Sequence, residues 1–442
     1  MSPKKFSSRY TSLYRKLSAQ EQVAILLYMS KWLIICTLVG ALVGTASELF
    51  LVSLAWATNW REAHPWIIAL LPAGGFLVGA LYYYFGKEVE AGNNLLIEQI
   101  HQPTHIVPFK MAPLVLIGTV ATHFFGGSAG REGTAVQMGG SIADQFTRLF
   151  RLSDEDRKTL LIAGISAGFA SVFGTPLAGA IFGLEVFFLG RIRYHAIFPS
   201  FVAAIMAETI ANAWGLEHTH YLIGEIPSMN VWHIGYAVGA GLCFGIAAFV
   251  FARSTHFFAS IFKRYISYPP LRPVVGGILV ALAVWTAGTT KYVGLGIPTI
   301  VDSFHTSLPP YDFALKIVFT AVTLGAGFKG GEVTPLFFIG ATLGNALSAI
   351  IPLPVGLLAG MGFVAVFAGA ANTPIATTIM AMELFGMEVG MFAGIACVVS
   401  YLISGHSGIY HSQVIGSSKH MRLSKEEGQK IGALPGLRKK DI

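Results

Sequence analysis

Two short stretches, Gly130-Arg131-Glu132-Gly133-Thr134 and Gly330-Gly331-Glu332-Val333-Thr334, decide the architecture that we expect of this chain. They lie 200 residues apart, and a glycine, the glutamate and the threonine occupy equivalent positions in both. The same spacing superposes Gly140 on Gly340. Self-similarity of this kind indicates an internal duplication, which composition alone does not reveal.

Two further pairs of stretches repeat in the same order. Thr175-Pro176-Leu177-Ala178 matches Thr373-Pro374-Ile375-Ala376 at a spacing of 198 residues, and a glutamate, Glu185 or Glu383, follows each. A weaker match sets the run that begins at Gly92 against the run that begins at Gly294, by order and spacing alone. Three matches in constant order predict two homologous halves of about 200 residues. The sequence does not say whether the halves are parallel or inverted.

The composition requires a membrane. Of the 442 residues, 54% are hydrophobic and only 12% are charged, whereas about 25% are charged in soluble proteins. Several apolar stretches exceed the roughly 20 residues that cross a hydrocarbon core. Others are shorter or are interrupted by Gly and Pro, as in partial helices buried inside a bundle. We therefore expect an all-α integral membrane protein with more than ten segments, many of them tilted or partial.

Basic residues flank the membrane region and predict its orientation. They lie in residues 1–31 and again near the end of the chain, so the positive-inside rule places both ends in the cytoplasm. Residues 1–31 are polar, and no cleavage site follows the first apolar run, so we expect no cleaved signal peptide. The net charge of +7 then reflects orientation, and no nucleic-acid partner is expected because no recognition module is visible. The basic residues are Lys4, Lys5, Arg9, Arg15, Lys16, Arg422, Lys425, Lys430, Arg438, Lys439 and Lys440.

The chain divides into five segments on these grounds. They are a cytoplasmic N-terminal segment (1–31), a first membrane repeat (32–252), a connector (253–273), a second membrane repeat (274–412) and a cytoplasmic tail (413–442). The connector is basic and rich in proline, which suits a surface linker. If the halves are inverted, each must cross the membrane an odd number of times. This would place the basic connector outside the cell, against the positive-inside rule. The helix count therefore stays open.

Glu132 and Glu332 are the main candidates for chemistry. Each follows a glycine-rich turn and precedes an apolar run, which places it near the start of a helix inside the membrane. Helix N-termini expose unpaired amide donors and a partial positive charge, so they bind anions without a cationic side chain. A carboxylate there can occupy the anion site when ionised and leave it when protonated. The competing interpretation is a capping carboxylate that never moves.

Several neighbouring residues can contribute donors to an anion. Thr334 offers a hydroxyl or merely caps a helix, and the amides of Asn93 and Asn94 serve an anion or form an Asx turn. Tyr410 follows the last apolar span, where its phenol can reach into a vestibule or lie at the interface. Arg131 pairs with a carboxylate or attracts anions. For Glu185 and Glu383 we favour helix-end hydrogen bonding over transport, and lone cysteines at 36, 243 and 397 suggest neither a disulfide nor a metal site.

At these residues the chain resembles the CLC family of chloride channels and proton-coupled anion antiporters. The run from Gly130 to Gly133 is similar to the signature around that family's gating glutamate. The runs that begin at Gly92 and Gly330 stand where the family has Gly-Ser-Gly-Ile-Pro and Gly-x-Phe-x-Pro, and Tyr410 stands at its central tyrosine. The resemblance implies an inverted repeat, a homodimer with one pathway per subunit, no cofactor and no enzyme activity. The short tail suggests a bacterial member, in the inner membrane.

Departures from the family pattern indicate its fluoride-exporting subclass. Asn93 replaces the serine that meets the central anion, Thr134 replaces the proline after the gating motif, and Glu332-Val333-Thr334 fills the second motif. Val186 stands in the place of the internal proton-transfer glutamate of chloride antiporters, and Glu185 falls one position earlier. Fluoride is small and strongly hydrated, so a selective site needs short, hard donors such as amides and hydroxyls.

These features together predict a fluoride/proton antiporter. Glu132 gates and carries protons, Glu332 is the second carboxylate, and the anion is bound by Gly130, Arg131, Gly133, Asn93, Asn94, Val333, Thr334 and Tyr410. A chloride/proton antiporter of the same fold and a passive anion channel remain alternatives. A receptor or scaffold that moves no ions is disfavoured, because each buried carboxylate would cost several kcal/mol without a purpose.

Overall fold

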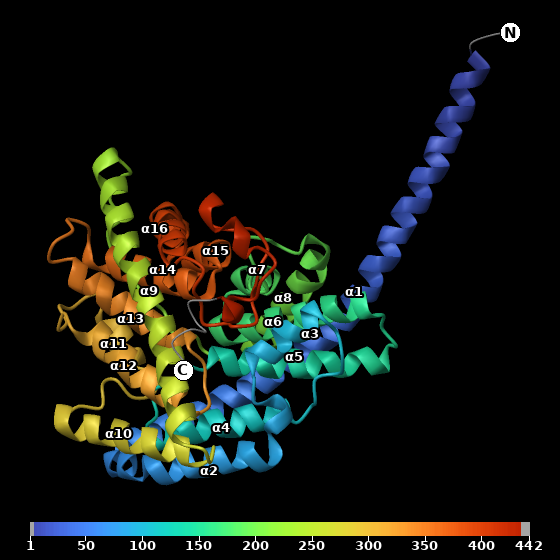
Figure 1. Ribbon diagram of the computed structural model, residues 1–442. Helices are drawn as coiled ribbons and strands as arrows, with labels where there is room; N and C mark the ends of the chain where they lie inside the picture. The colour runs from blue at the N-terminus through green and yellow to red at the C-terminus, as the bar shows by residue number, and fades with distance from the viewer. Residues whose placement is uncertain (1–3, 435–442) are drawn as a thin grey trace.

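The structure, a computed structural model, describes residues 4–434, with side chains from residue 21 onward. The side chains of Lys4, Lys5, Arg9, Arg15 and Lys16 lie outside the described part, and so do Arg438, Lys439 and Lys440 in the tail. Their predicted role in orientation stays a prediction. The described chain is mostly helical, with two short strands, which confirms the all-α fold class (Figure 1).

Two series of eight helices follow one another along the chain. The first series contains α1 (Lys4–Ala63), α2 (Leu71–Phe85), α3 (Asn93–His101), α4 (Met111–Phe125), α5 (Glu132–Leu149), α6 (Asp154–Phe173), α7 (Pro176–Glu185) and α8 (Ile197–Ala213). The second contains α9 (Val231–Tyr265), α10 (Leu271–Ala287), α11 (Ile297–Asp302), α12 (Asp312–Gly325), α13 (Val333–Leu347), α14 (Val355–Ala371), α15 (Pro374–Phe385) and α16 (Gly390–Ile403). Corresponding helices have corresponding neighbours. The helix α1 packs on α8 and α6, as α9 packs on α16 and α14, and the pair α5–α6 corresponds to the pair α13–α14.

The predicted connector is mostly helical. Residues 253–265 complete α9 and residues 271–273 begin α10, so only a short loop at 266–270 resembles a linker. Composition misled here because basic residues and prolines also suit helix ends. Since α9 packs like α1, we propose that the halves meet in the irregular segment 214–230 instead.

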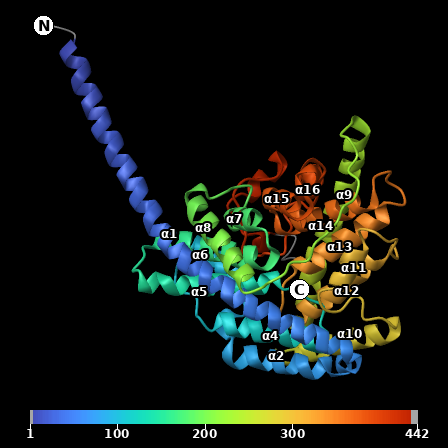
Figure 2. The same cartoon turned by 180° about the vertical axis from the view of Figure 1, so that it is seen from behind.

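Long and short apolar helices coexist, as expected. Over the described residues, four segments are long and apolar enough to cross a membrane: Glu21–Ala63, Pro65–Phe85, Tyr194–Ala213 and Val231–Tyr265. Seven shorter apolar helices accompany them, including α13 and α14. The helix α1 crosses the back of the bundle as a long rod (Figure 2). Large apolar side chains such as Trp56, Trp66 and Trp232 are exposed on the surface, as lipid-facing residues are.

Glycines let the central helix pairs approach closely. A Cβ atom on Gly340 of α13 would lie 1.9 Å from the carbonyl oxygen of Gly362 on α14. In the other half, a Cβ on Gly139 of α5 would lie 2.2 Å from the carbonyl oxygen of Gly164 on α6. Small residues at such crossings are typical of helix packing in membranes. This packing fixes the starts of α5 and α13, which carry the two glutamates.

The last described residues fold back onto the bundle. The strand β2 (Val414–Ile415) pairs in parallel with β1 (Phe188–Leu189) from the first half. Lys430 Nζ lies 2.9 Å from an oxygen of Glu98 on α3, and Ser412 donates to the same carboxylate. The tail is thus anchored beside α3.

Candidate functional site

The two motif turns meet at the centre of the molecule. Gly130 N–H donates to the carbonyl oxygen of Gly331 at 2.6 Å, and Gly331 N–H donates back to Gly130 at 2.8 Å, in an antiparallel bridge. Gly330 adopts φ +155°, and a Cβ there would lie 2.5 Å from that of Ala129, so a side chain is excluded. The bridge brings the N-termini of α5 and α13 together. Both the N–H and the C=O of Gly130 are used in this bridge. Gly130, which the sequence predicts to bind the anion, therefore positions the helix starts instead.

Glu132 caps the helix of the other half. Its carboxylate accepts from the Thr334 hydroxyl at 2.5 Å and from the Thr334 N–H at 3.0 Å. The Arg131 N–H donates to it at 3.1 Å. The side chain of Glu132 is 1% exposed. A carboxylate therefore occupies the position at the start of α13 where unpaired amide donors favour an anion.

The neighbours of Glu132 divide into those that face it and those that do not. Arg131 Nε lies 3.6 Å from the Glu132 carboxylate, which is one of the two roles that the sequence leaves open for this arginine. Thr134 turns away, and its hydroxyl lies 2.7 Å from that of Thr119 on α4. Gly133 permits close packing, because a Cβ there would lie 3.1 Å from Asn93 Nδ2. Val333 is buried at the start of α13 and offers no side-chain donor.

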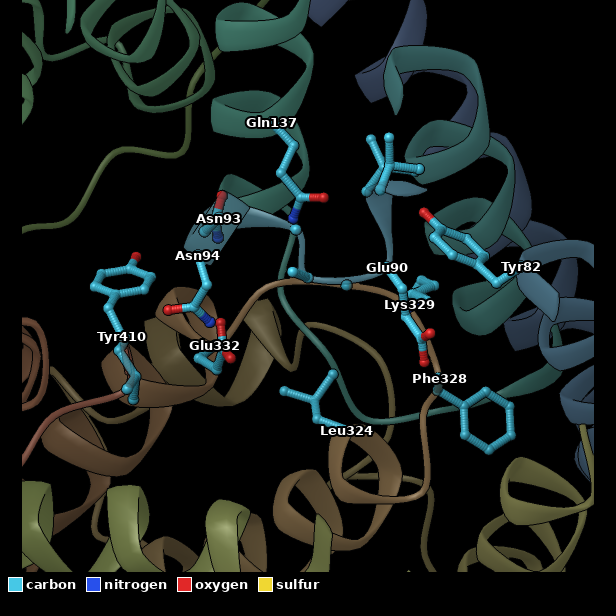
Figure 3. A pocket seen from close by; sticks show the side chains of 16 residues that line it. Tyr82, Glu90, Asn93, Asn94, Gln137, Leu324, Phe328, Lys329, Glu332 and Tyr410 are labelled. Carbon is cyan, nitrogen blue, oxygen red and sulfur yellow. The ribbon is translucent and has the colours of Figure 1, made fainter. Parts of the chain in front are cut away.

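A cavity of about 150 Å³ lies on one side of the bridge. It brings together four predicted residues, Asn93, Asn94, Glu332 and Tyr410, from both halves of the chain (Figure 3). We call it the inner cavity, because Ile409 and Tyr410, just before the tail that is predicted to be cytoplasmic, line it. The N–H of Ser412, the last residue of the second repeat, donates to Asn94 Oδ1 at 3.0 Å.

Glu332 differs from Glu132 in its surroundings. It precedes α13 as its N-cap residue and lines the inner cavity, and no other described residue donates a hydrogen bond to its carboxylate. The Asn94 side chain extends toward it (Figure 3). Asn93 Oδ1 is buried without a partner among the described residues. An unpaired buried polar atom beside a cavity is typical of a site that exchanges ligands or water.

Four polar residues of the inner cavity escaped the sequence analysis. They are Gln137 on α5, Tyr82 on α2, Glu90 and Lys329. Gln137 lies five residues after Glu132 in an apolar run, a signal that was available. Glu90 and Lys329 lie just before the runs that begin at Gly92 and Gly330, and packing brings them and Tyr82 to this cavity.

A second, smaller cavity of about 20 Å³ is lined by Glu132, and we call it the outer cavity. Arg131, Glu132 and Thr334 line it together with aromatic residues that include Phe337 and Tyr221. Phe337 is the repeat counterpart of Gln137, so the same position is polar toward one cavity and aromatic toward the other. Glu132 therefore lines the outer cavity, whereas Glu332 lines the inner one.

Glu185 and Glu383 cap each other's helices. Glu185, at the end of α7, accepts from the N–H groups of Ile375 and Ala376 at 3.2 and 2.9 Å. Glu383 on α15 accepts from Leu177 and Ala178 at 2.9 and 2.8 Å. This reciprocal capping supports the helix-end interpretation, because the carboxylate of Glu185 is used to cap α15.

The arrangement can exchange an anion for a proton. When Glu132 is ionised, it fills the donor site of α13. When it is protonated, it carries no negative charge to match that site, and the N–H and hydroxyl of Thr334 become free for another anion. No group of three metal-ligating side chains occurs within residues 21–434, whose side chains the structure describes.

The comparisons with known proteins agree with this geometry. A family model described as voltage gated chloride channel matches residues 74–405. A chloride/fluoride channel protein of Pseudomonas syringae pv. tomato is 59% identical over 418 residues, covering 93% of this chain and 92% of the relative. The crystal structure of a CLC-type fluoride/proton antiporter matches with a TM-score of 0.85 at 34% identity, over 87% of this chain and 98% of that one. A slow cyanobacterial Cl⁻/H⁺ antiporter shares the fold, with a TM-score of 0.74 at 20% identity over 84% of this chain and 94% of its own.

Proposed function

The chain belongs to the voltage gated chloride channel family, CLC, and is a multi-pass membrane protein; from this premise we propose that it exports fluoride in exchange for protons. The observation that carries the proposal is the Glu132 carboxylate at the N-terminus of α13, where it accepts two hydrogen bonds from Thr334. An anion and an ionised Glu132 compete for the same donors. Competition of this kind couples anion entry to protonation of the glutamate.

Fluoride fits the donors at this site better than chloride does. The hydroxyl and the N–H of Thr334 each donate to one oxygen of the Glu132 carboxylate, and the amides of Asn93, Asn94 and Gln137 line the inner cavity. A small, strongly hydrated anion needs such short, hard donors in place of its water. The relatives named above include a chloride/fluoride channel protein and a fluoride/proton antiporter. They support fluoride as the substrate.

Glu332 is the second proton-handling group in this proposal. Val186 cannot carry a proton, and Glu185 is occupied in capping α15. Glu332 instead lines the inner cavity with no donor from another described residue, so it is free to accept a proton from the cytoplasmic side. Protons therefore pass between Glu132 and Glu332 on opposite sides of the Gly130–Gly331 bridge.

Proton coupling gives the export its direction. Hydrogen fluoride crosses membranes as a neutral weak acid and dissociates in a less acidic cytoplasm. Inward proton movement through this protein drives the trapped fluoride out. The proposal also places the protein as a homodimer in a bacterial inner membrane.

Flux from proteoliposomes tests the proposal directly. Vesicles loaded with fluoride or with chloride are diluted into anion-free buffer, and anion release and internal pH are recorded together. We expect faster fluoride than chloride release, and uphill proton movement when only an anion gradient is imposed. Faster chloride release would make the protein a chloride antiporter.

A passive channel is the second candidate, because the Pseudomonas syringae relative is named a channel. A channel moves the anion without protons. Anion release with no proton movement against a gradient would replace our proposal with this one.

A further inference from the structure

Lys329 lines the inner cavity, where its ammonium contacts the face of an aromatic ring. Its Nζ lies 3.9 Å from the centroid of the Tyr82 ring. Gly118 on α4 makes room for both, since a Cβ there would lie 3.0 Å from Lys329 Cβ and 3.3 Å from the Tyr82 ring. An ammonium on an aromatic face is held by the ring quadrupole and keeps its N–H donors available.

This ammonium is not neutralised by an ion pair. Among the described residues, no carboxylate oxygen lies within 4.0 Å of Lys329 Nζ, and Glu90 acts on it only at longer range. Lys329 is the one cation in the lining of the inner cavity, whereas Glu90 and Glu332 supply two carboxylates. Figure 3 shows Lys329 and Glu90 together at one end of the cavity and Glu332 with Asn94 at the other.

The lining poses a problem for any anion that enters. Two carboxylates repel it, and the donors of Thr334 are occupied by Glu132. A single ammonium at the Glu90 end of the cavity offsets part of the repulsion, because opposite charges attract at this range even in water. Gln137 adds an amide to the same cavity.

We propose that Lys329 forms a recruitment site for a small, hard, monovalent anion in the inner cavity, separate from the site at Thr334. The anion binds Lys329 first and then moves toward Thr334 when Glu132 leaves. Glu90, in the same lining, weakens this recruitment by repulsion. This inference rests on the proposed function, because it assumes that the anion enters by the inner cavity.

The test compares the variants Lys329→Gln, Lys329→Arg and Glu90→Gln in the flux assay. For Lys329→Gln we expect the fluoride concentration at half-maximal rate to rise about fivefold, with a maximal rate within twofold of wild type. Lys329→Arg is expected to keep the half-maximal fluoride concentration of the wild type, and Glu90→Gln is expected to lower it. Lys110, an exposed lysine that pairs with Glu88 at 2.8 Å, supplies the control Lys110→Gln, which leaves both values unchanged.

Two outcomes overturn the inference. A fall in maximal rate without a change in half-maximal concentration assigns Lys329 a structural role. An equal loss in Lys110→Gln reduces the effect to general surface charge. Calorimetric titration of the detergent-solubilised protein with sodium fluoride provides a readout without transport, and Lys329→Gln is expected to weaken binding by a similar factor. If the wild type moves chloride and no fluoride, the proposed function fails, and the same variants are titrated with chloride to test Lys329 alone.

Discussion

The two glutamates of the repeat occupy equivalent positions in sequence but opposite situations in space. Glu132 accepts three hydrogen bonds and is 1% exposed. Glu332 lines a cavity and receives no bond from another described residue. Duplication supplied two carboxylates, and packing between the halves made one a helix cap and left the other open. A repeat therefore predicts where such groups lie and not what each one does.

The strongest test of this difference removes the charge from each glutamate in turn. Glu132→Gln carries no titrating proton at the α13 site, so we expect proton coupling to disappear while passive anion flux remains. In Glu332→Gln, Glu132 still competes with the anion for the α13 site. We therefore expect proton coupling to be reduced and turnover to be slower. Simultaneous recordings of fluoride release and internal pH measure both. Full coupling in Glu132→Gln would contradict the assignment of the gate.

The glycine crossings supply the next comparison. In Gly340→Ala the new Cβ meets a backbone carbonyl oxygen at 1.9 Å, which cannot yield without moving α14. In Gly140→Ala, its repeat counterpart, the Cβ meets only the flexible side chain of Leu96 at 2.7 Å. We expect a loss of about 3 kcal/mol or failure to fold for the first, and less than about 1.5 kcal/mol for the second. Thermal unfolding in detergent, followed by size-exclusion chromatography, ranks them.

The paired threonines give a smaller and more specific effect. Thr334→Val removes the hydroxyl that donates to Glu132, and hydrogen bonds to charged groups contribute about 1.5–3 kcal/mol. We expect fluoride flux to fall about tenfold or more. Thr134→Val breaks the contact with Thr119 and is expected to alter stability by about 1 kcal/mol with flux within twofold of wild type. Equal flux losses in both variants would remove the distinction between the halves.

The reciprocal caps are expected to show the smallest effect. Glu185→Gln replaces a buried acceptor of two N–H bonds, at a cost of about 1–2 kcal/mol. Glu383 is only half-buried, so solvent screens its interactions and Glu383→Gln costs less. Both variants retain proton coupling if the caps are structural. If Glu185→Gln lost proton coupling while keeping normal stability, Glu185 would be assigned to the proton route instead.

The sequence predicts much of the fold and half of the site. Spacing between repeats located Glu132, Glu332 and both Thr-Pro turns, because local motifs set helix starts. It did not show that Glu132 bonds to Thr334, since that contact joins segments about 200 residues apart through packing. Lys329 was missed because no pattern in its neighbours signals the Tyr82 ring beside it. The predicted connector is mostly helical, because a basic, proline-containing stretch can end one helix and begin another.

The bond from Thr334 to Glu132 has an evolutionary consequence. Thr334 in the second half donates a hydrogen bond to Glu132 in the first half, so each of these residues acts through a residue of the other half. A substitution at residue 334 changes the environment of residue 132 as directly as a substitution at residue 132 itself. The two copies are therefore no longer free to drift apart, and changes at these positions are expected to occur together among descendants of the same ancestor.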